Sequence, residues 1–576
     1  MVAFLGFLLA AVLRYAPAFI EGLFLLVAIR TAFTSPQLGA KWFRALEVSF
    51  GRLARKRRLS VLLAGLVVLA ARVALLPLLP VPEPLIQDEF SYLLAADTFA
   101  SGRLANPPHP MWVHFESMGV NQQPTYTSKF PPAQGLVLAA GKVLAGSAWL
   151  GVCLSVAVMC SAICWMLEAW LPPGWALLGG ILAAMRLGIF GYWMNSYWGG
   201  AVAATGGALV LGAMPRIMRR QRIGDALLLA LGVAILANSR PYEGFVLCAP
   251  VAVALLLWMF GKKGPAASIT IQRVALPIFL ALAFAAAAMG FYNWRVTGSP
   301  LRVPHRLHGE TYTIAPLFLW QSLRPAPNYH HQAMHDFYVG WEGGLFLKSN
   351  SLWGAVRNAL EKGRDFWLFF LGPLFTLPLV MLPRVLRDRR TRFLLITLVI
   401  FSVGLFLDAW FYPHYAAPMT ALLYAIVLQA MRHLRFCKWG ERRPGQLLAP
   451  SIPLVCFAMV VLLICAQPFN HFLSEFPLNW FHTGPGNVDR ARILADLERR
   501  DGRHLVIVRY GPGHNVLGEW IYNRADLDRA KVLWARDMGP SGNEEMIRYF
   551  TDRRVWVVEP DRSPPRLSPY AGFPVP

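Results

Sequence analysis

The sequence predicts a polytopic α-helical membrane protein, with about 11–12 transmembrane helices and a small C-terminal extracytoplasmic α/β domain. Of its 576 residues, 56% are hydrophobic and only 15% are charged, against roughly 25% charged in a soluble protein. The formal net charge is nevertheless +23. A disordered chain is not this apolar, and one soluble core of this length would need more polar surface.

Twelve stretches are apolar over lengths near the roughly 20 residues that cross a bilayer. They fall near 1–29, 59–80, 149–170, 174–190, 197–214, 223–238, 244–260, 274–292, 366–383, 393–411, 415–431 and 449–467. The first lacks a basic start and a small-residue cleavage site, so we expect a retained helix rather than a signal peptide.

The positive charge lies in alternate links between these stretches. These links hold 24 basic and three acidic residues and lie at 41–58, 215–222, 261–273, 384–392 and 432–443. Cytoplasmic loops carry such an excess, so we place these links inside and the other links and the tail outside the cytoplasmic membrane. The tail has 15 basic and 14 acidic residues, so the charge reports orientation and no nucleic-acid partner is expected.

Three regions follow from this pattern. Residues 1–58 form a membrane helix with a basic cytoplasmic segment, and 59–468 form the transmembrane domain. That domain carries two long outer loops, the first long loop (81–148) and the second long loop (293–365). Residues 469–576 form the outer domain, and the outer regions contain no cysteine, so no disulfide framework is expected.

The tail alternates strand-like and helix-like segments, which favours a parallel sheet. Strands are predicted at 505–508, 531–534 and 555–558, and helices at 487–500, 524–530 and 543–550. Gly511-Pro512-Gly513-His514 follows the first strand and is either a ligand-binding loop or a plain turn.

The first long loop carries the residues most suited to chemistry. Asp88 and Glu89 follow a membrane span, and adjacent helical side chains point about 100° apart. One carboxylate can therefore face a cavity while the other holds the loop or binds a partner; the alternative is a charge pair favoured by a helix N-terminus. Lys129 precedes two prolines and is either a phosphate contact or a lysine reaching to lipid headgroups.

Together these residues resemble the GT-C superfamily of membrane glycosyltransferases. The closest likeness is to the branch of protein O-mannosyltransferases and of the transferases that add aminoarabinose to lipid A. Asp88, Glu89 and Tyr92 match its Asp-Glu-x-x-Tyr motif. Lys129 and the later prolines match its Lys-Pro-Pro turn, with Phe130 inserted.

The resemblance covers roughly residues 59–467 and implies transfer of a sugar from a polyprenyl-phosphate donor, with inversion, on the outer face. The acceptor would be a hydroxyl of a glycan, lipid or protein. Asp88 would be the general base, Glu89 would orient a loop or the acceptor, Tyr92 would lie in the substrate site, and Lys129 would contact phosphate. No nucleotide-binding glycine motif occurs in the sequence.

Other outer turns add candidates by position. Within 238–244, Arg240 could bind phosphate and Glu243 could bind sugar hydroxyls or hold Arg240, with Tyr242 beside them; a structural ion pair is the alternative.

Two aromatic turns complete the candidate set. His414 and Tyr415 stand where the family often has Arg before Tyr near the lipid phosphate, so any charge there would depend on pH. Asn195 and Tyr197, in the aromatic run 191–200, would contact sugar, unless this run is only an interfacial belt.

No metal site is predicted. His331 and His335 have an i, i+4 spacing that can hold a metal, but only Asp336 accompanies them, which favours solvated histidines. Some GT-C enzymes use a divalent metal, so the resemblance leaves metal dependence open.

Two other functions compete with the glycosyltransferase. A transporter or flippase of lipid-linked glycans could use Arg72, Arg186 and Asp408 as a path, but the halves show no matching interrupted helices. A polymerase or ligase of lipid-linked glycans would use large outer loops with Arg and His pairs.

Overall fold

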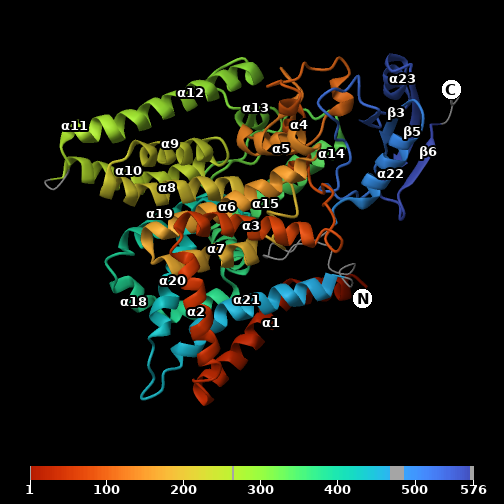
Figure 1. Ribbon diagram of the computed structural model, residues 1–576. Helices are drawn as coiled ribbons and strands as arrows, with labels where there is room; N and C mark the ends of the chain where they lie inside the picture. Colours follow the sequence, from red (N-terminus) through yellow and green to blue (C-terminus); the bar gives the residue numbers. More distant parts are fainter. Residues whose placement is uncertain (1, 262–264, 468–484, 571–576) are drawn as a thin grey trace.

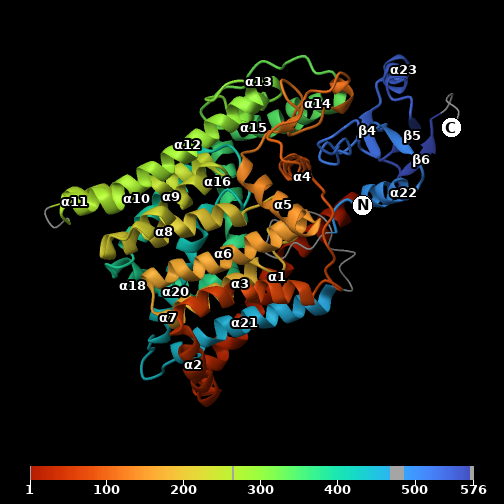
Figure 2. The same cartoon turned by 45° about the horizontal axis from the view of Figure 1, so that its top comes forward.

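The computed structural model describes residues 2–261, 265–467 and 485–570, with side chains from residue 15 onward. Long helices run side by side in one bundle, and a small α/β domain lies at one end (Figure 1; Figure 2). We call this the domain end and the opposite one the basic end. Lys262 and Lys263, and the first residues of the predicted outer domain, lie outside the described residues.

The bundle contains the predicted spans. Its main helices are α1 (Val2–Thr34), α3 (Arg57–Ala74), α5 (Pro132–Ala145), α6 (Ala148–Trp170), α7 (Pro173–Leu187), α8 (Ala201–Arg220), α9 (Ile223–Ala237), α10 (Pro241–Phe260), α12 (Leu276–Thr297), α16 (Leu352–Phe366), α19 (Arg392–Leu407), α20 (Thr420–Arg435) and α21 (Gly445–Ala466). Seven described helical stretches are long and apolar enough to cross a bilayer, and four further apolar helices are shorter. The prediction of a multi-pass helical membrane protein is confirmed.

Glycines let the central helices approach closely. A Cβ on Gly141 of α5 would lie 2.3 Å from the backbone nitrogen of Gly151 in α6. A Cβ on Gly207 of α8 would lie 1.8 Å from the carbonyl oxygen of Pro418. Small residues of this kind are typical of packed membrane helices, and the first of these contacts brings α5, the helix that follows Lys129, close to α6.

A buried ion pair joins α1 to the rest of the bundle. Arg186 Nη1 of α7 donates to Glu21 Oε1 at 2.7 Å, and Arg186 Nη2 donates to the carbonyl of Leu371 at 3.0 Å. Both charged side chains are fully buried. The N-terminal helix is therefore part of the packed core.

The basic end differs from the predicted link at 41–58. This segment forms a helix, α2 (Ala40–Ala54), that packs Phe43 and Phe50 inward while Trp42 is exposed. A pair between Arg435 Nη2 and Glu47 Oε2, 2.6 Å apart, joins α2 to the C-terminal end of α20. An apolar stripe at helical spacing, interrupted by arginines, explains why this segment folds as an amphipathic helix.

The α/β domain has the predicted parallel core. Its elements are α22 (Val488–Arg499), β3 (Arg503–Val508), β4 (Val532–Arg536), α23 (Gly539–Tyr549), β5 (Arg553–Glu559) and β6 (Arg566–Pro569). The strand order is β4-β3-β5-β6, with β3 parallel to both β4 and β5. Strand β6 is antiparallel to β5 and was not predicted.

Two predictions for this domain are settled by side-chain bonds. The helix expected at 524–530 is wrong, because the Asn523 side chain bonds both the backbone N–H and the carbonyl of Trp534, each at 2.8 Å, and holds the chain along β4. The loop at Gly511–His514 is held by hydrogen bonds to Asp561. Asp561 accepts from Gly511 N at 2.8 Å and from His514 Nδ1 at 2.7 Å, which favours a plain turn.

We expect replacement of either partner of the Glu21–Arg186 pair to destabilise the protein, because the remaining charge stays buried without the opposite charge of this pair. Glu21→Met or Arg186→Leu alone should lower the free energy of unfolding by about 3–5 kcal/mol, and the double variant should recover most of it. Thermal unfolding of the purified protein in detergent measures this effect. Glu47→Gln, at an exposed pair, is the control and should cost at most about 1 kcal/mol; single variants as stable as the control would contradict the expectation.

Candidate active site

Glu89 fixes the start of helix α4 (Gln87–Ala100). Its Oε2 accepts backbone N–H bonds from Leu85 at 2.8 Å and Ile86 at 3.2 Å, and its Oε1 accepts one from Tyr197 at 2.9 Å. Only 4% of Glu89 is exposed. Both of its oxygens are thus occupied by backbone, which favours the loop-holding role left open by the sequence over contact with an acceptor.

The Asp88 side chain points in a different direction from that of Glu89 and is accessible. Trp198 Nε1 donates to Asp88 Oδ2 at 2.9 Å, and Lys129 Nζ lies 3.8 Å from Asp88 Oδ1. The Asp88 and Lys129 side chains are 20% and 18% exposed. The two residues that the motifs single out therefore lie side by side at the domain end of the bundle.

A short hairpin places Lys129. Strands β1 (Val120–Asn121) and β2 (Thr127–Ser128) pair antiparallel. Ser91 Oγ of α4 contacts both the carbonyl of Gly119 at 2.6 Å and Ser128 Oγ at 2.8 Å, so the hairpin is tied to the helix that carries Asp88. Lys129 follows β2 directly.

Phe130, the residue inserted relative to the family motif, has a structural role. Its ring stacks on Tyr92 with centroids 4.4 Å apart and planes 18° apart. This stack anchors the turn on α4 and leaves Lys129 beside Asp88. Tyr92 lies within electrostatic range of both Arg240 and Asp88, and burial raises the pKa of its phenol.

Arg240 lies at the same end of the bundle, at the start of α10. Its guanidinium carbon is 4.2 Å from the centre of the Tyr415 ring, and its Nη1 is 3.9 Å from Glu243 Oε1. Glu243 is buried, which favours the reading in which it holds Arg240. A cation over an aromatic face keeps its charge while remaining available to an anion.

His414 does not provide the pH-dependent charge expected from the sequence. Its ring nitrogen Nδ1 hydrogen-bonds the Tyr192 hydroxyl at 2.9 Å, and the residue is 1% exposed. Burial, reinforced by the charge of Arg240, holds the pKa of His414 well below its usual range, so the imidazole stays neutral. The His414 ring instead packs against Trp198, 4.8 Å between centroids.

Three residues predicted in the substrate site have their polar groups engaged elsewhere. Asn195 accepts from Arg72 Nη2 at 3.1 Å and donates to the carbonyl of Ile189 at 2.9 Å. The Tyr197 hydroxyl donates to the Pro82 carbonyl at 3.1 Å, and the Tyr242 hydroxyl donates to the Gly404 carbonyl at 2.9 Å. These residues build the walls of the site, and we place no sugar contact on their side chains.

Two residues near Asp88 were not predicted. Trp198 belongs to the aromatic run already noted, but only the fold shows that its N–H meets Asp88. Glu342, from the second long loop, lies within electrostatic range of Lys129 and Asp88. Nothing in the spacing of Glu342 distinguishes it from a surface acid.

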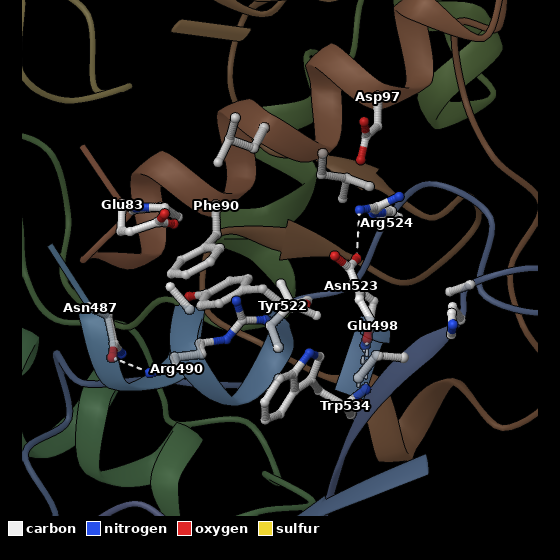
Figure 3. Close-up of a pocket in the computed structure, with 18 of the residues that line it drawn as sticks. Glu83, Phe90, Asp97, Asn487, Arg490, Glu498, Tyr522, Asn523, Arg524 and Trp534 are labelled. Atoms are coloured by element: carbon white, nitrogen blue, oxygen red, sulfur yellow. Dashed lines mark hydrogen bonds and ion pairs between the residues drawn. The ribbon is translucent and has the colours of Figure 1, made fainter. Parts of the chain in front are cut away.

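The α/β domain packs against the side of α4 that faces away from the bundle. Phe90 stacks on Tyr522 with ring centroids 4.2 Å apart and planes 2° apart. Figure 3 shows Arg490 between the rings of Phe90 and Trp534, with its guanidinium carbon 4.7 Å and 4.6 Å from their centres. These contacts border a pocket of about 200 Å³ between α4 and the domain.

A second set of bonds holds the domain to the first long loop. Arg536 Nε donates to the Glu116 carbonyl at 2.7 Å, and the same guanidinium pairs with the buried Glu519. The Tyr522 hydroxyl donates to the Met118 carbonyl at 3.3 Å. The domain therefore fixes the loop on one side while the bundle fixes it on the other.

The histidines of the second long loop join it to the first. His330 Nδ1 donates to Glu116 Oε2 at 2.8 Å, and His331 Nε2 donates to the Val113 carbonyl at 2.6 Å. His335 is exposed beside Asp336. Across the part of the chain that the structure describes, no three His, Cys, Asp or Glu side chains are grouped to hold a metal ion.

No protein-family model and no curated protein matches this chain. Among solved structures, the Archaeoglobus fulgidus oligosaccharyltransferase in complex with zinc and sulfate matches 87% of this chain and 67% of its own, at 13% identity and a TM-score of 0.49. ArnT from Cupriavidus metallidurans in the apo state matches 86% of this chain and 92% of its own, at 12% identity and a TM-score of 0.46. The same ArnT bound to undecaprenyl phosphate gives a TM-score of 0.45 at 12% identity, over 86% of this chain and 92% of its own.

At identities of 12–13% and TM-scores below 0.5, these matches assign no role to any residue of this chain.

Proposed function

We propose that the protein transfers a sugar from a polyprenyl-phosphate-linked donor to a hydroxyl of a glycan, lipid or protein acceptor, with inversion at the anomeric carbon. The observation that carries the proposal is the accessible pair of Asp88 and Lys129, 3.8 Å apart, at one end of a membrane-spanning bundle. A carboxylate and a cation at the membrane boundary fit a reaction whose donor is a lipid phosphate.

In the proposed reaction Asp88 is the general base. The acceptor hydroxyl gives its proton to an Asp88 oxygen while its own oxygen bonds to the anomeric carbon. The bond from that carbon to the phosphate oxygen breaks, and its electron pair stays on the phosphate. The Trp198 N–H bond orients the carboxylate.

Lys129 and Arg240 are the proposed phosphate contacts. A charge-assisted hydrogen bond is about 2.7–2.9 Å long, so the 3.8 Å separation leaves the Lys129 ammonium free to bind a phosphate oxygen. Arg240 is held over Tyr415 on the same side of the bundle. Fixed cations stabilise the negative charge that develops on the leaving phosphate.

The structure offers little support for the two competing functions. Arg72, Arg186 and Asp408 are each at most 2% exposed and do not line an open path. They are bonded to neighbours: Arg186 to Glu21, Arg72 to Asn195, and Asp408 to the backbone N–H of Trp410 at 2.9 Å. Three second-loop histidines that a polymerase or ligase could use, His308, His330 and His331, instead hold the two long loops together.

We propose that the basic end faces the cytoplasm and the domain end faces outward from the cytoplasmic membrane. Single cysteines at two exposed serines test this orientation. In sealed spheroplasts, a membrane-impermeant maleimide should label Ser541→Cys of α23, and should label Ser49→Cys of α2 only after permeabilisation. Labelling in the reverse order would overturn the orientation and with it the placement of the active site.

Removal of the proposed base should abolish transfer without unfolding the protein. We expect Asp88→Asn to lower kcat by about 10²–10⁴-fold, measured by mass spectrometry of products formed by purified protein from polyprenyl-phosphate sugars. Asp97→Asn is the matched control, because Asp97 lies on the same helix and its side chain is 19% exposed, against 20% for Asp88. Full activity of Asp88→Asn would remove Asp88 from the base role.

Removal of the proposed phosphate contact should weaken both donor binding and turnover. Lys129→Met should reduce kcat by about 100-fold and weaken binding of free polyprenyl phosphate. Lys142→Met is the control, since Lys142 also pairs with an aspartate of α4, Asp97, but not at the proposed site. Equal effects of the two substitutions would show that the Lys129 effect is structural.

A further inference from the structure

The second long loop is fixed onto the first by a buried polar and aromatic cluster. His308 of α13 (Pro304–Thr311) bonds Asn121 Oδ1 at 3.1 Å through Nδ1 and the Tyr338 hydroxyl at 2.7 Å through Nε2. Tyr338 lies in the π-helical segment η3 (Asp336–Gly343) and is 1% exposed. Segments of this kind are frequent at functional sites, and this one has a fixed position relative to the hairpin before Lys129.

Glu342 lies in this fixed segment and has an unusual environment. Its Oε2 atom is buried and has no hydrogen-bond partner among the described residues. The titratable groups within electrostatic range are Lys129 and Asp88 of the first long loop, Tyr412 of the turn before α20, and Tyr329 and Tyr338 of the second long loop. Apart from Lys129, all of them are acids.

One lysine is thus shared by two carboxyl groups. If both carboxyl groups are ionised, the site has two negative charges against the single positive charge of Lys129. An anionic donor phosphate would add to the repulsion. Asp88 accepts a hydrogen bond from Trp198, whereas Glu342 Oε2 has no partner among the described residues. Burial raises the pKa of Glu342 to about 7, with Lys129 opposing and Asp88 reinforcing the rise. When neighbouring carboxyl groups differ in this way, one serves as base and the other as acid.

We propose that Glu342 is the proton donor to the leaving lipid phosphate, an assignment that rests on the proposed glycosyl transfer. As the bond between the anomeric carbon and the phosphate oxygen breaks, the Glu342 carboxyl proton passes to the phosphate, while Asp88 takes the acceptor proton. Glu342 ends ionised and Asp88 protonated. A proton passed from Asp88 to Glu342 through water restores both groups.

The pH dependence has a definite sign. Glu342 is competent only when protonated, so its contribution is complete below a pKa of about 7 and falls as pH rises through it. Wild-type kcat/KM should therefore fall by about tenfold per unit above this pH. Glu342→Gln has no titrating carboxyl, so it should have kcat about 100-fold lower and no alkaline fall from this group.

Glu310→Gln is the matched control, because Glu310 lies in the same loop but at an exposed pair with Arg306. A second readout does not depend on turnover. Free polyprenyl phosphate should bind wild type up to about fivefold more weakly at pH 8 than at pH 7, because the ionised Glu342 repels it. Glu342→Gln should show a smaller change than wild type and Glu310→Gln the same change.

The outcomes separate this proposal from the proposed function. If wild type transfers no sugar at any pH, the proposed function fails. If wild type transfers sugar and Glu342→Gln has the same kcat, the role of Glu342 is wrong. If Glu342→Gln is slow but keeps the full alkaline fall and the full pH dependence of phosphate binding, Glu342 only positions other groups and the proton-donor role is overturned.

Discussion

The arrangement of the site depends on one buried carboxylate, Glu89. Three backbone N–H groups, from two residues before α4 and from Tyr197, converge on its two oxygens. A buried carboxylate without such partners would be strongly destabilising, so the chain around it has little freedom. Because Asp88 is the neighbouring helical residue, fixing Glu89 also fixes the direction of Asp88, about 100° away. The carboxylate proposed as the base is thus held in place by a buried neighbouring carboxylate.

The rest of the site lies on two sides of Asp88 and Glu89, the bundle side and the side of the α/β domain. On the bundle side, Trp198 and the His414 ring pack behind Asp88, and the neutral His414 adds no charge there. On the outer side, the α/β domain stacks Tyr522 on Phe90, two residues along α4 from Asp88. The domain thus helps to keep α4 rigid, because this helix carries the proposed base and is packed on both faces.

Hydropathy and charge identify the membrane bundle and its spans from sequence alone, because a bilayer imposes length and composition on each helix. The two motifs also single out Asp88 and Lys129 from sequence alone, and the fold places them 3.8 Å apart. The partners of Asn195 and Tyr197 could not be predicted, since they are groups on other elements that only the tertiary fold brings near. Glu342 could not be predicted either, because nothing distinguishes it from other acids in long loops until the fold shows its neighbours. At 524–530 the local helix propensity is overridden, because the side chain of the preceding Asn523 bonds strand β4.

The central claim is that a lipid phosphate binds between Asp88 and the cations of the domain end. A structure of the protein with bound polyprenyl phosphate tests it most directly. The account predicts a phosphate oxygen within about 3 Å of Lys129 Nζ, with Arg240 and Glu342 facing the same group and the polyprenyl chain extending along the bundle. A phosphate bound instead in the pocket between α4 and the α/β domain, or at the basic end, would contradict it.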